Sequence, residues 1–256
     1  MSDRIDIEGV ESRRRLAGIG KVVLVGSGKG GVGKTLVSCG LALALAREGR
    51  RTGVFDIDIH GASVPSYLGV GPPVRSTSRG LEPKKIRGVS VMSPALFTGE
   101  NPTPVKGAKK QSLIARLFSL TNWGDLDVLV VDLPPGAGDE LLAAFSLFGK
   151  SELVLVTTPS KAALGVVLRL RKLAEGEGVR VKGVVVNMAY IKQGRGKVVY
   201  PFGKPGGGAI EKALMAPVIV EVPLVPQVST EGLARALEED AGLSEAFDRL
   251  SSAVRS

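Results

Sequence analysis

The sequence is poor in the residues that build metal clusters and disulfides. It contains one cysteine, Cys39, and one histidine, His60. A single cysteine excludes an internal disulfide, and one cysteine with one histidine cannot supply the ligands of a classical zinc site. We therefore expect neither kind of cross-link, and we expect Cys39 to be a small buried apolar residue.

Long apolar runs are also missing. The longest ones, such as VLVVDLPP from Val128 onward, reach only about six to eight residues, whereas a membrane span needs roughly 20. The N-terminal stretch MSDRIDIEGVESRRR is charged and lacks the apolar core of a secretory signal. We therefore expect a cytoplasmic protein without membrane attachment.

Acidic residues are outnumbered. Lys and Arg total 34 against 25 Asp and Glu, so the formal net charge is +9, while aromatic residues make up only 4%. Both a nucleic-acid partner and a plainly solvated basic surface fit this charge. The basic residues are scattered and mostly lack interleaved aromatic rings, which favours the solvated surface. They group at 13–15, 84–85, 106–110, 169–172 and 192–204.

What the sequence does contain is a repeated order of short apolar runs and longer amphipathic stretches. The expected strands are 21–26, 52–57, 88–93, 127–132, 152–157, 180–187 and 217–222. The expected helices are 34–48, 108–121, 138–148, 161–176, 207–215, 229–239 and 243–254. This order predicts an α/β fold with a doubly wound, mostly parallel sheet and helices on both faces. Two irregular segments, 59–87 and 189–207, are predicted to be long loops of functional importance.

The most informative stretch is GKGGVGKT, which follows the first expected strand and opens the first expected helix. It matches the phosphate-binding pattern G-x-x-x-x-G-K-[ST]. Lys34 is expected to reach the β- and γ-phosphates of a nucleotide, and Thr35 to bind Mg²⁺. The predicted nucleotide-binding residues of this loop are Gly28, Lys29, Gly30, Gly31, Val32, Gly33, Lys34 and Thr35. We expect a basic N-terminal extension over residues 1–18 and a single P-loop domain over 19–256.

Carboxylates end two of the expected strands. Asp132 closes the run DVLVVD and is predicted to hold the metal at the carboxyl edge of the sheet. Asp56 and Asp58 are two positions apart, so one is expected at the magnesium shell and the other beside the attacking water. We assign Asp56 to the metal and Asp58 to the water, and we expect His60 to be a loop residue.

The lysine at position 29 is not required by the phosphate pattern. With it, the loop resembles the deviant Walker A motif of the MinD/ParA/NifH class of P-loop ATPases. Within that class, DIDIHGASVPSYLG, DLPPGAGDE, VVVNMAYI, FGKPGG and VPLVPQV resemble the Mrp/Nbp35/ApbC family of iron–sulfur cluster carriers, in that family's order.

The resemblance implies a Mg²⁺-dependent ATPase that acts as a homodimer. It implies that Lys29 crosses the dimer interface to the partner's nucleotide, where it would be catalytic alongside the Asp58 already expected beside the attacking water. It further implies that Asn187 reads the adenine and that the segment starting at Pro223 walls the base pocket. The implied cofactors are ATP and Mg²⁺.

The sequence departs from that family at one point. The family usually carries a C-P-x-C pair just after its NM motif, and two protomers hold one [4Fe–4S] cluster there. Here the segment between Asn187 and Gly203 contains no cysteine. Cluster iron is held by thiolates, typically four. A bridging [4Fe–4S] cluster of the usual construction is therefore not expected.

Three functions remain open at this stage. The first is a dimeric ATPase with a role in iron–sulfur protein assembly, serving client proteins. The second is a ParA-like positioning ATPase that binds DNA through its basic patches. The third is a nucleotide-binding regulatory subunit that works with a cysteine-bearing paralogue.

Overall fold

The computed structural model describes residues 7–98, 108–136, 138–193, 197–204 and 206–255. Lys106 and Arg195, two of the basic residues noted above, lie outside these ranges, and the side chains of Lys109 and Lys110 are not described either. Among the helices of the described ranges, none has the length and apolar character needed to cross a bilayer.

An eight-stranded sheet forms the centre of the molecule, in the order β12-β9-β8-β1-β7-β2-β6-β5. All neighbours pair in parallel except β5 and β6, which are antiparallel. The strands are β1 (Ile19–Ser27), β2 (Thr52–Asp56), β5 (Lys84–Ile86), β6 (Val89–Met92), β7 (Leu126–Asp132), β8 (Glu152–Thr157), β9 (Arg180–Val186) and β12 (Val218–Glu221). The predicted α/β, doubly wound and mostly parallel fold is thereby confirmed.

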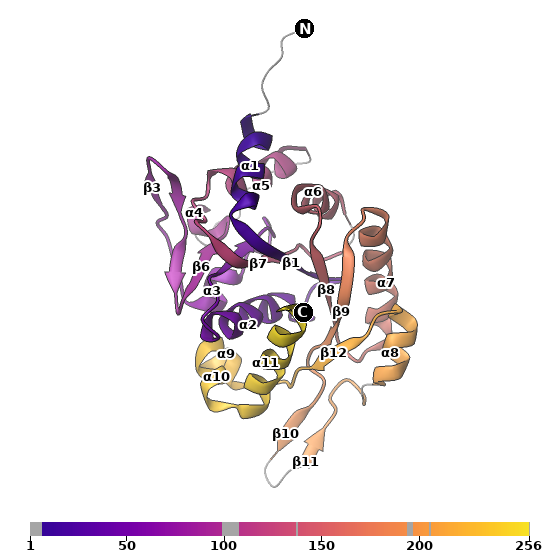
Figure 1. The fold of residues 1–256 in the computed structure, drawn as a ribbon. Coiled ribbons are helices and arrows are strands. Elements are labelled where there is room, and N and C mark those ends of the chain that lie inside the picture. Colours follow the sequence, from indigo (N-terminus) through magenta and orange to yellow (C-terminus); the bar gives the residue numbers. More distant parts are fainter. Residues whose placement is uncertain (1–6, 99–107, 137, 194–196, 205, 256) are drawn as a thin grey trace.

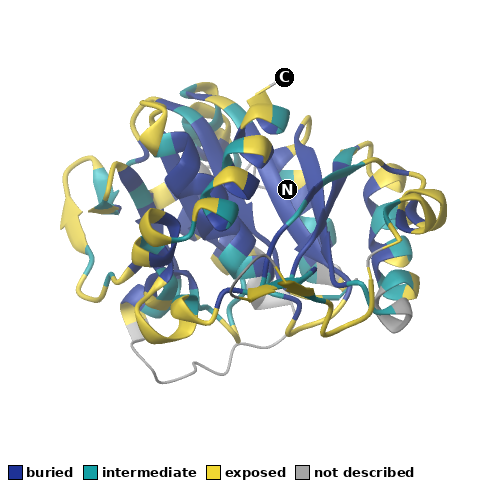
Figure 2. Cartoon of the chain, turned by 90° about the horizontal axis from the view of Figure 1, so that it is seen from below, coloured by how far each residue is buried: buried dark blue, intermediate teal, exposed yellow. Residues whose placement is uncertain are grey.

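Helices cover both faces of this sheet (Figure 1). Alternate residues of β1 supply two separate cores: Val22 and Leu24 face one, and Val23 and Val25 face the other. The longer helices are α1 (Ile7–Ala17), α2 (Lys34–Arg47), α5 (Ala108–Leu120), α6 (Asp139–Phe148), α7 (Lys161–Gly176), α8 (Gly207–Leu214), α10 (Leu233–Glu239) and α11 (Ala241–Arg255). Figure 2 shows the strands as the buried centre, with exposed residues on the outer helices and loops.

The two segments predicted to be long loops contain short elements. Residues 59–87 include α3 (Val64–Leu68) and a hairpin of β3 (Arg75–Thr77) and β4 (Gly80–Glu82), before β5. Residues 189–207 include a hairpin of β10 (Ile191–Gln193) and β11 (Lys197–Val199). These elements are too short to show a period in the sequence.

The remaining differences are small. The helix expected over 229–239 is two helices, α9 (Gln227–Thr230) and α10. They are separated at Gly232, whose φ of 88° lies in the left-handed region. The short α4 (Ala95–Thr98) and the N-terminal α1, which packs against α5, were not predicted from the sequence.

Candidate nucleotide site

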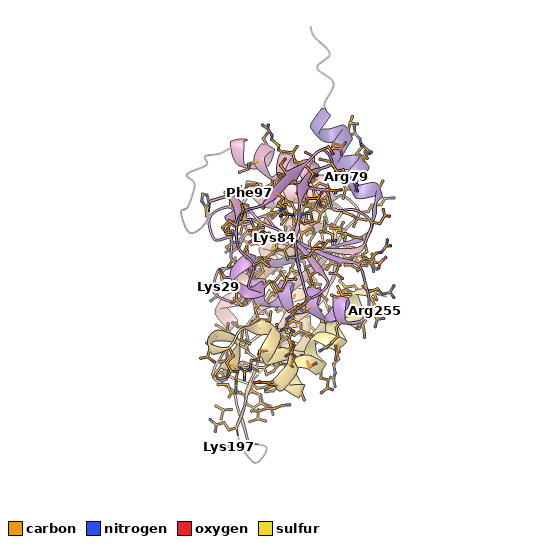
Figure 3. The ribbon with its side chains drawn as sticks, turned by 90° about the vertical axis from the view of Figure 1, so that its left-hand side faces the viewer. Lys29, Arg79, Lys84, Phe97, Lys197 and Arg255 are labelled. Atoms are coloured by element: carbon orange, nitrogen blue, oxygen red, sulfur yellow. The ribbon has the colours of Figure 1, made fainter. Side chains whose placement is uncertain are left out.

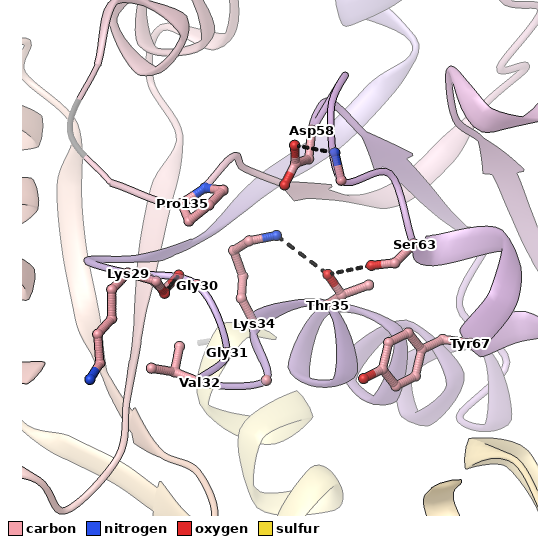
Figure 4. Close-up of a pocket in the computed structure, with 13 residues that line it drawn as sticks. Lys29, Gly30, Gly31, Val32, Lys34, Thr35, Asp58, Ser63, Tyr67 and Pro135 are labelled. Carbon is pink, nitrogen blue, oxygen red and sulfur yellow. Dashed lines mark hydrogen bonds between the residues drawn. The ribbon is translucent and has the colours of Figure 1, made fainter. Parts of the chain in front are cut away.

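The predicted phosphate loop joins β1 to α2 at the carboxyl edge of the sheet, where β1 lies between β7 and β8. It borders a cavity of about 220 Å³ (Figure 4). The residues that line this cavity are Ser27, Lys29, Gly30, Gly31, Val32, Gly33, Lys34, Thr35, Asp58, Gly61, Ser63, Tyr67 and Pro135. Most of the predicted loop residues thus line one cavity, and Asp58 joins them from the segment just after β2, which is separated from β1 by β7.

Glycine is required at these loop positions for different physical reasons. Gly31 and Gly33 both have φ of 79°, in the left-handed region that glycine adopts without strain. Gly28 is packed instead, because a Cβ there would lie 2.5 Å from the backbone nitrogen of Val167 on α7. Gly33 precedes α2 without a side-chain cap, so the amides of the first helical turn remain available to an anion.

A buried ion pair lies beneath the loop. The Nζ of Lys34 is 2.7 Å from Oδ2 of Asp132, and the two side chains are 7% and 1% exposed. Thr35 donates its hydroxyl to the same Oδ2 at 2.8 Å, and Ser38 donates to Oδ1 at 2.6 Å. Ser63 in turn donates to Oγ1 of Thr35 at 3.1 Å (Figure 4). The network brings together the lysine, hydroxyl and carboxylate that the sequence predicted for phosphate and metal.

Asp56 is fully buried beside this network. Its Oδ2 accepts hydrogen bonds from the amide of Val64 and the hydroxyl of Ser93, and its Oδ1 accepts from the amide of Asp58. Burial, and next the charge of nearby Asp132, raise the pKa of Asp56 to about 7. Since a bound cation favours the ionised carboxylate, this site is suited to a metal that offsets the two acids.

Asp58 lies further out, at the wall of the cavity. Its Oδ1 accepts a hydrogen bond from the amide of Gly61 at 2.9 Å, which fixes the direction of the carboxylate (Figure 4). The two aspartates therefore differ in environment, since Asp56 is enclosed and Asp58 is only half-buried.

Lys29 is exposed, and its side chain points away from Lys34 in the close-up (Figure 4). Its backbone carbonyl accepts a hydrogen bond from the hydroxyl of Ser27, which holds the start of the loop. The two lysines of the motif thus face different surroundings: Lys34 is paired inside, and Lys29 reaches the surface.

Asn187 follows β9 and touches the phosphate loop directly. Its Nδ2 donates to the carbonyl of Val32 at 2.8 Å, and a Cβ on Gly33 would lie 2.1 Å from the same nitrogen. Asn187 is 2% exposed, and Pro223 is also buried. The predicted adenine contacts of these two residues stay predictions, and Pro223 is not among the residues lining the cavity.

Cys39 lies inside α2 and is fully buried in the core on that face. Burial raises the pKa of its thiol well above the ordinary value, and the charges of Asp132 and Asp56 act in the same direction. The thiol is thereby kept protonated, which is the wrong form for binding iron.

Several contributors to the site were not predicted. The hydroxyls of Ser38, Ser63 and Ser93 orient the carboxylates and Thr35. Tyr67 and Pro135 line the cavity. Of these residues, only Ser38 could have been found from the sequence. It lies one helical turn after Lys34 on the helix that begins at the motif, which places it on the same side of that helix.

The donors present fit a nucleotide and a hard divalent cation. The loop offers glycine amides and a lysine to phosphate, and the hydroxyl and carboxylates below it are oxygen ligands of the kind that Mg²⁺ prefers. Fold and site together define a P-loop NTPase with the arrangement of the MinD/ParA class.

Comparison with known proteins makes this assignment narrower. The sequence model described as ParA, NUBPL iron-transfer P-loop NTPase, matches residues 18–254. The chain therefore belongs to the NUBPL iron-transfer P-loop NTPase family, which confirms the resemblance seen in the motifs.

Three curated relatives show how far the similarity reaches. The iron–sulfur cluster carrier protein of Saccharolobus solfataricus is 38% identical over 209 residues, which cover 79% of this chain and 71% of the relative. That of Bacillus subtilis is 39% identical over 204 residues, covering 78% and 57%. The cytosolic Fe-S cluster assembly factor NUBP2 of Rattus norvegicus is 36% identical over 245 residues, covering 91% and 88%.

Solved structures agree on the fold. A nucleotide-binding protein from Archaeoglobus fulgidus, in complex with ADP, has a TM-score of 0.80 and 30% identity, covering 93% of this chain and 96% of that one. The cell division ATPase MinD of Pyrococcus furiosus has a TM-score of 0.68 at 23% identity, covering 92% and 98%, and shows the shared fold alone.

Proposed function

We propose that this protein is a Mg²⁺-dependent ATPase that hydrolyses ATP to ADP and phosphate. The observation that carries the proposal is the buried network of Lys34, Thr35 and Asp132 beneath the glycine loop. In nucleotide-free protein Asp132 holds the lysine and the threonine hydroxyl in place. On nucleotide binding, Lys34 would exchange the carboxylate of Asp132 for phosphate oxygens, while the oxygen of the Thr35 hydroxyl would be free to face Mg²⁺.

Each remaining residue has one task in this scheme. The amides of the glycine loop and Lys34 would bind and orient the phosphates. Thr35, Asp132 and Asp56 would hold Mg²⁺, which would supply charge neutralisation. Asp58 orients the attacking water with a carboxylate already fixed by Gly61. Hydrolysis of this kind depends on positioning and charge stabilisation. The orientation of the Asp58 carboxylate therefore matters more than its strength as a base.

We further propose that the protein works as a homodimer and that Lys29 acts on the nucleotide of the partner protomer. An exposed lysine in the phosphate loop, directed away from the protomer's own Lys34, supports this assignment. A second cation delivered in trans would stabilise the charge that develops during phosphoryl transfer, as an arginine finger does.

The biological role we propose is the carriage or assembly of iron–sulfur clusters for client proteins in the cytoplasm. The curated relatives, which are named as iron–sulfur cluster carrier or assembly proteins, support it. The sequence between Asn187 and Gly203 lacks cysteine, and Cys39 is buried and protonated. The thiolate ligands of a bridging cluster would therefore have to come from another protein, for example from a cysteine-bearing paralogue.

Phosphate release from ATP, measured with and without Mg²⁺, tests the enzymatic part. We expect Mg²⁺-dependent turnover in the wild type and loss of tight ATP binding in Lys34→Ala. Asp58→Asn should bind ATP and fail to hydrolyse it, because positioning is lost while the phosphate contacts remain. Unchanged ATP affinity of Lys34→Ala by calorimetry would contradict the assignment of the phosphate loop.

Anaerobic reconstitution with iron and sulfide tests the cluster part. We expect no stable, stoichiometric [4Fe–4S] cluster by visible absorbance and by iron and sulfide analysis. One cluster per dimer that is lost in Cys39→Ser would overturn this expectation. ATP-dependent, salt-sensitive retention on DNA would instead favour a ParA-like positioning role.

A further inference from the structure

A second cavity lies at the edge of the sheet opposite to the phosphate loop. It has a volume of about 500 Å³ and is bordered by the residues that begin β1, β8 and β9. The phosphate loop follows the other end of β1, so the length of that strand separates the two sites. Figure 3 shows this separation: Lys29 lies on one side of the molecule and Arg255 on the other, and Lys21 of the cavity donates to the carbonyl of Val254, the neighbour of Arg255.

The charged side of the cavity is built around one carboxylate. The charged lining residues are Lys21, Lys150, Glu152 and Arg180. In the parallel pairing of β8 with β9, Glu152 lies opposite Arg180, and the two form an ion pair. The other oxygen of the same carboxylate is 3.5 Å from Nζ of Lys21 and 3.9 Å from Nζ of Lys182. Since the side chain of Glu152 is only 10% exposed, it anchors three cations at the start of the strands.

These charges do not balance. Three cationic side chains and one carboxylate line the cavity, which leaves an excess of two positive charges, and Lys182 lies just behind them. Burial, and next the charge of Arg180, lower the pKa of Lys21. Burial and the charges of Lys21 and Arg180 also lower the pKa of Lys182. The cations therefore repel one another, and an anion among them would relieve the repulsion.

The carboxylates of the adjoining segments do not supply this anion. They are Glu48, Asp125, Asp127 and Glu177, and none of them lines the cavity. Arg255 pairs with Glu48, and Arg51 pairs with both aspartates. Glu177 is exposed at the end of α7. Among the described side chains that line the cavity, Glu152 is thus the only negative charge.

Apolar side chains form the rest of the lining. Val22 and Phe148 are 9% and 5% exposed and belong to one of the two cores, against which Leu16 of α1 packs. Val22 follows Lys21 along β1, so the two side chains point to opposite faces of the sheet. A cavity at the start of the strand meets both faces, which gives it a charged side and an apolar side. Its volume is in the range of small-molecule sites.

We propose that this cavity binds a small organic dianion, such as a phosphate monoester, whose apolar group lies toward Phe148. The excess of two positive charges matches a dianion and opposes a metal cation. Lys21 and Arg180 are already oriented by Glu152, and both have more N–H donors than their present partners use. The site uses none of the residues assigned to ATP, so it is independent of the proposed ATPase activity.

Isothermal titration calorimetry with phenyl phosphate tests the proposal. The compound should bind the wild type, weaken as salt is added, and bind more tightly than inorganic phosphate, which has no apolar group. Arg180→Gln and Lys21→Gln should each lower the affinity about tenfold. Lys150→Gln, which leaves all partners of Glu152 in place, should lower it about threefold. The matched control Lys172→Gln removes an exposed lysine outside the cavity and should bind as the wild type does.

Lys34→Met locates the bound compound, because it alters the phosphate loop and leaves the cavity intact. It should bind phenyl phosphate as the wild type does. Weaker binding in Lys34→Met with normal binding in Arg180→Gln would place the compound at the phosphate loop and overturn the inference. Equal affinity of the wild type and of cavity variants with native circular dichroism would also overturn it, as would equal affinity for phenyl phosphate and inorganic phosphate. Absent phosphate release from ATP in the wild type would contradict the proposed ATPase alone.

Discussion

The buried pair of Lys34 and Asp132 makes a quantitative prediction about the nucleotide-free protein. Replacing Lys34 by Met keeps the length of the side chain and removes its charge, so Asp132 stays buried without a counter-charge. Removing one partner of a buried pair costs about 3–5 kcal/mol. The hydroxyls of Thr35 and Ser38 still donate to the carboxylate, so we expect the lower end, about 3 kcal/mol.

Urea unfolding followed by the fluorescence of Trp123, the single tryptophan and 4% exposed, measures this loss. Lys29→Met is the matched control, since it removes an exposed lysine of the same loop and should change the free energy of unfolding by less than about 0.5 kcal/mol. Adding Asp132→Asn to Lys34→Met should restore part of the loss, because the carboxylate that lost its counter-charge is then removed as well. Equal stability of the two lysine variants would refute the role given to the pair.

Three further predictions concern other parts of the site. The pKa of Asp56 is raised to about 7, so between about pH 4 and 7 the folded state binds a proton that the unfolded state has lost. The free energy of unfolding should therefore fall as pH rises through this window, and Asp56→Asn should flatten that slope in urea titrations. Asn187→Ala should weaken the binding of tripolyphosphate, which has no base, because the hydrogen bond from Asn187 to Val32 of the phosphate loop is lost. Weaker binding of ATP alone would mean that Asn187 contacts only the adenine. Gly28→Ala should lower the melting temperature, since its Cβ meets the backbone of α7, whereas Gly30→Ala, with open space around its Cβ, should not.

The sequence predicted the fold because the strands are covered on both faces. Such strands are continuous apolar runs, as in Val128–Val131, and the phosphate motif then placed the site at their carboxyl ends. The hydroxyls of Ser63 and Ser93 escaped prediction because serine has no periodic signal, and their roles depend on segments that meet only in the fold. The β10–β11 hairpin escaped because three-residue strands carry no detectable alternation.

The central claim is that each active site is completed by Lys29 of the other protomer. Mixing Lys29→Ala with Asp58→Asn tests it, since each variant alone should be inactive. In a mixed dimer one site keeps Asp58 and receives an intact Lys29 from the partner. With half of the dimers mixed and one working site in each, the phosphate-release rate should recover to about one quarter of wild type. No recovery, although the two variants form mixed dimers with ATP, would contradict the account.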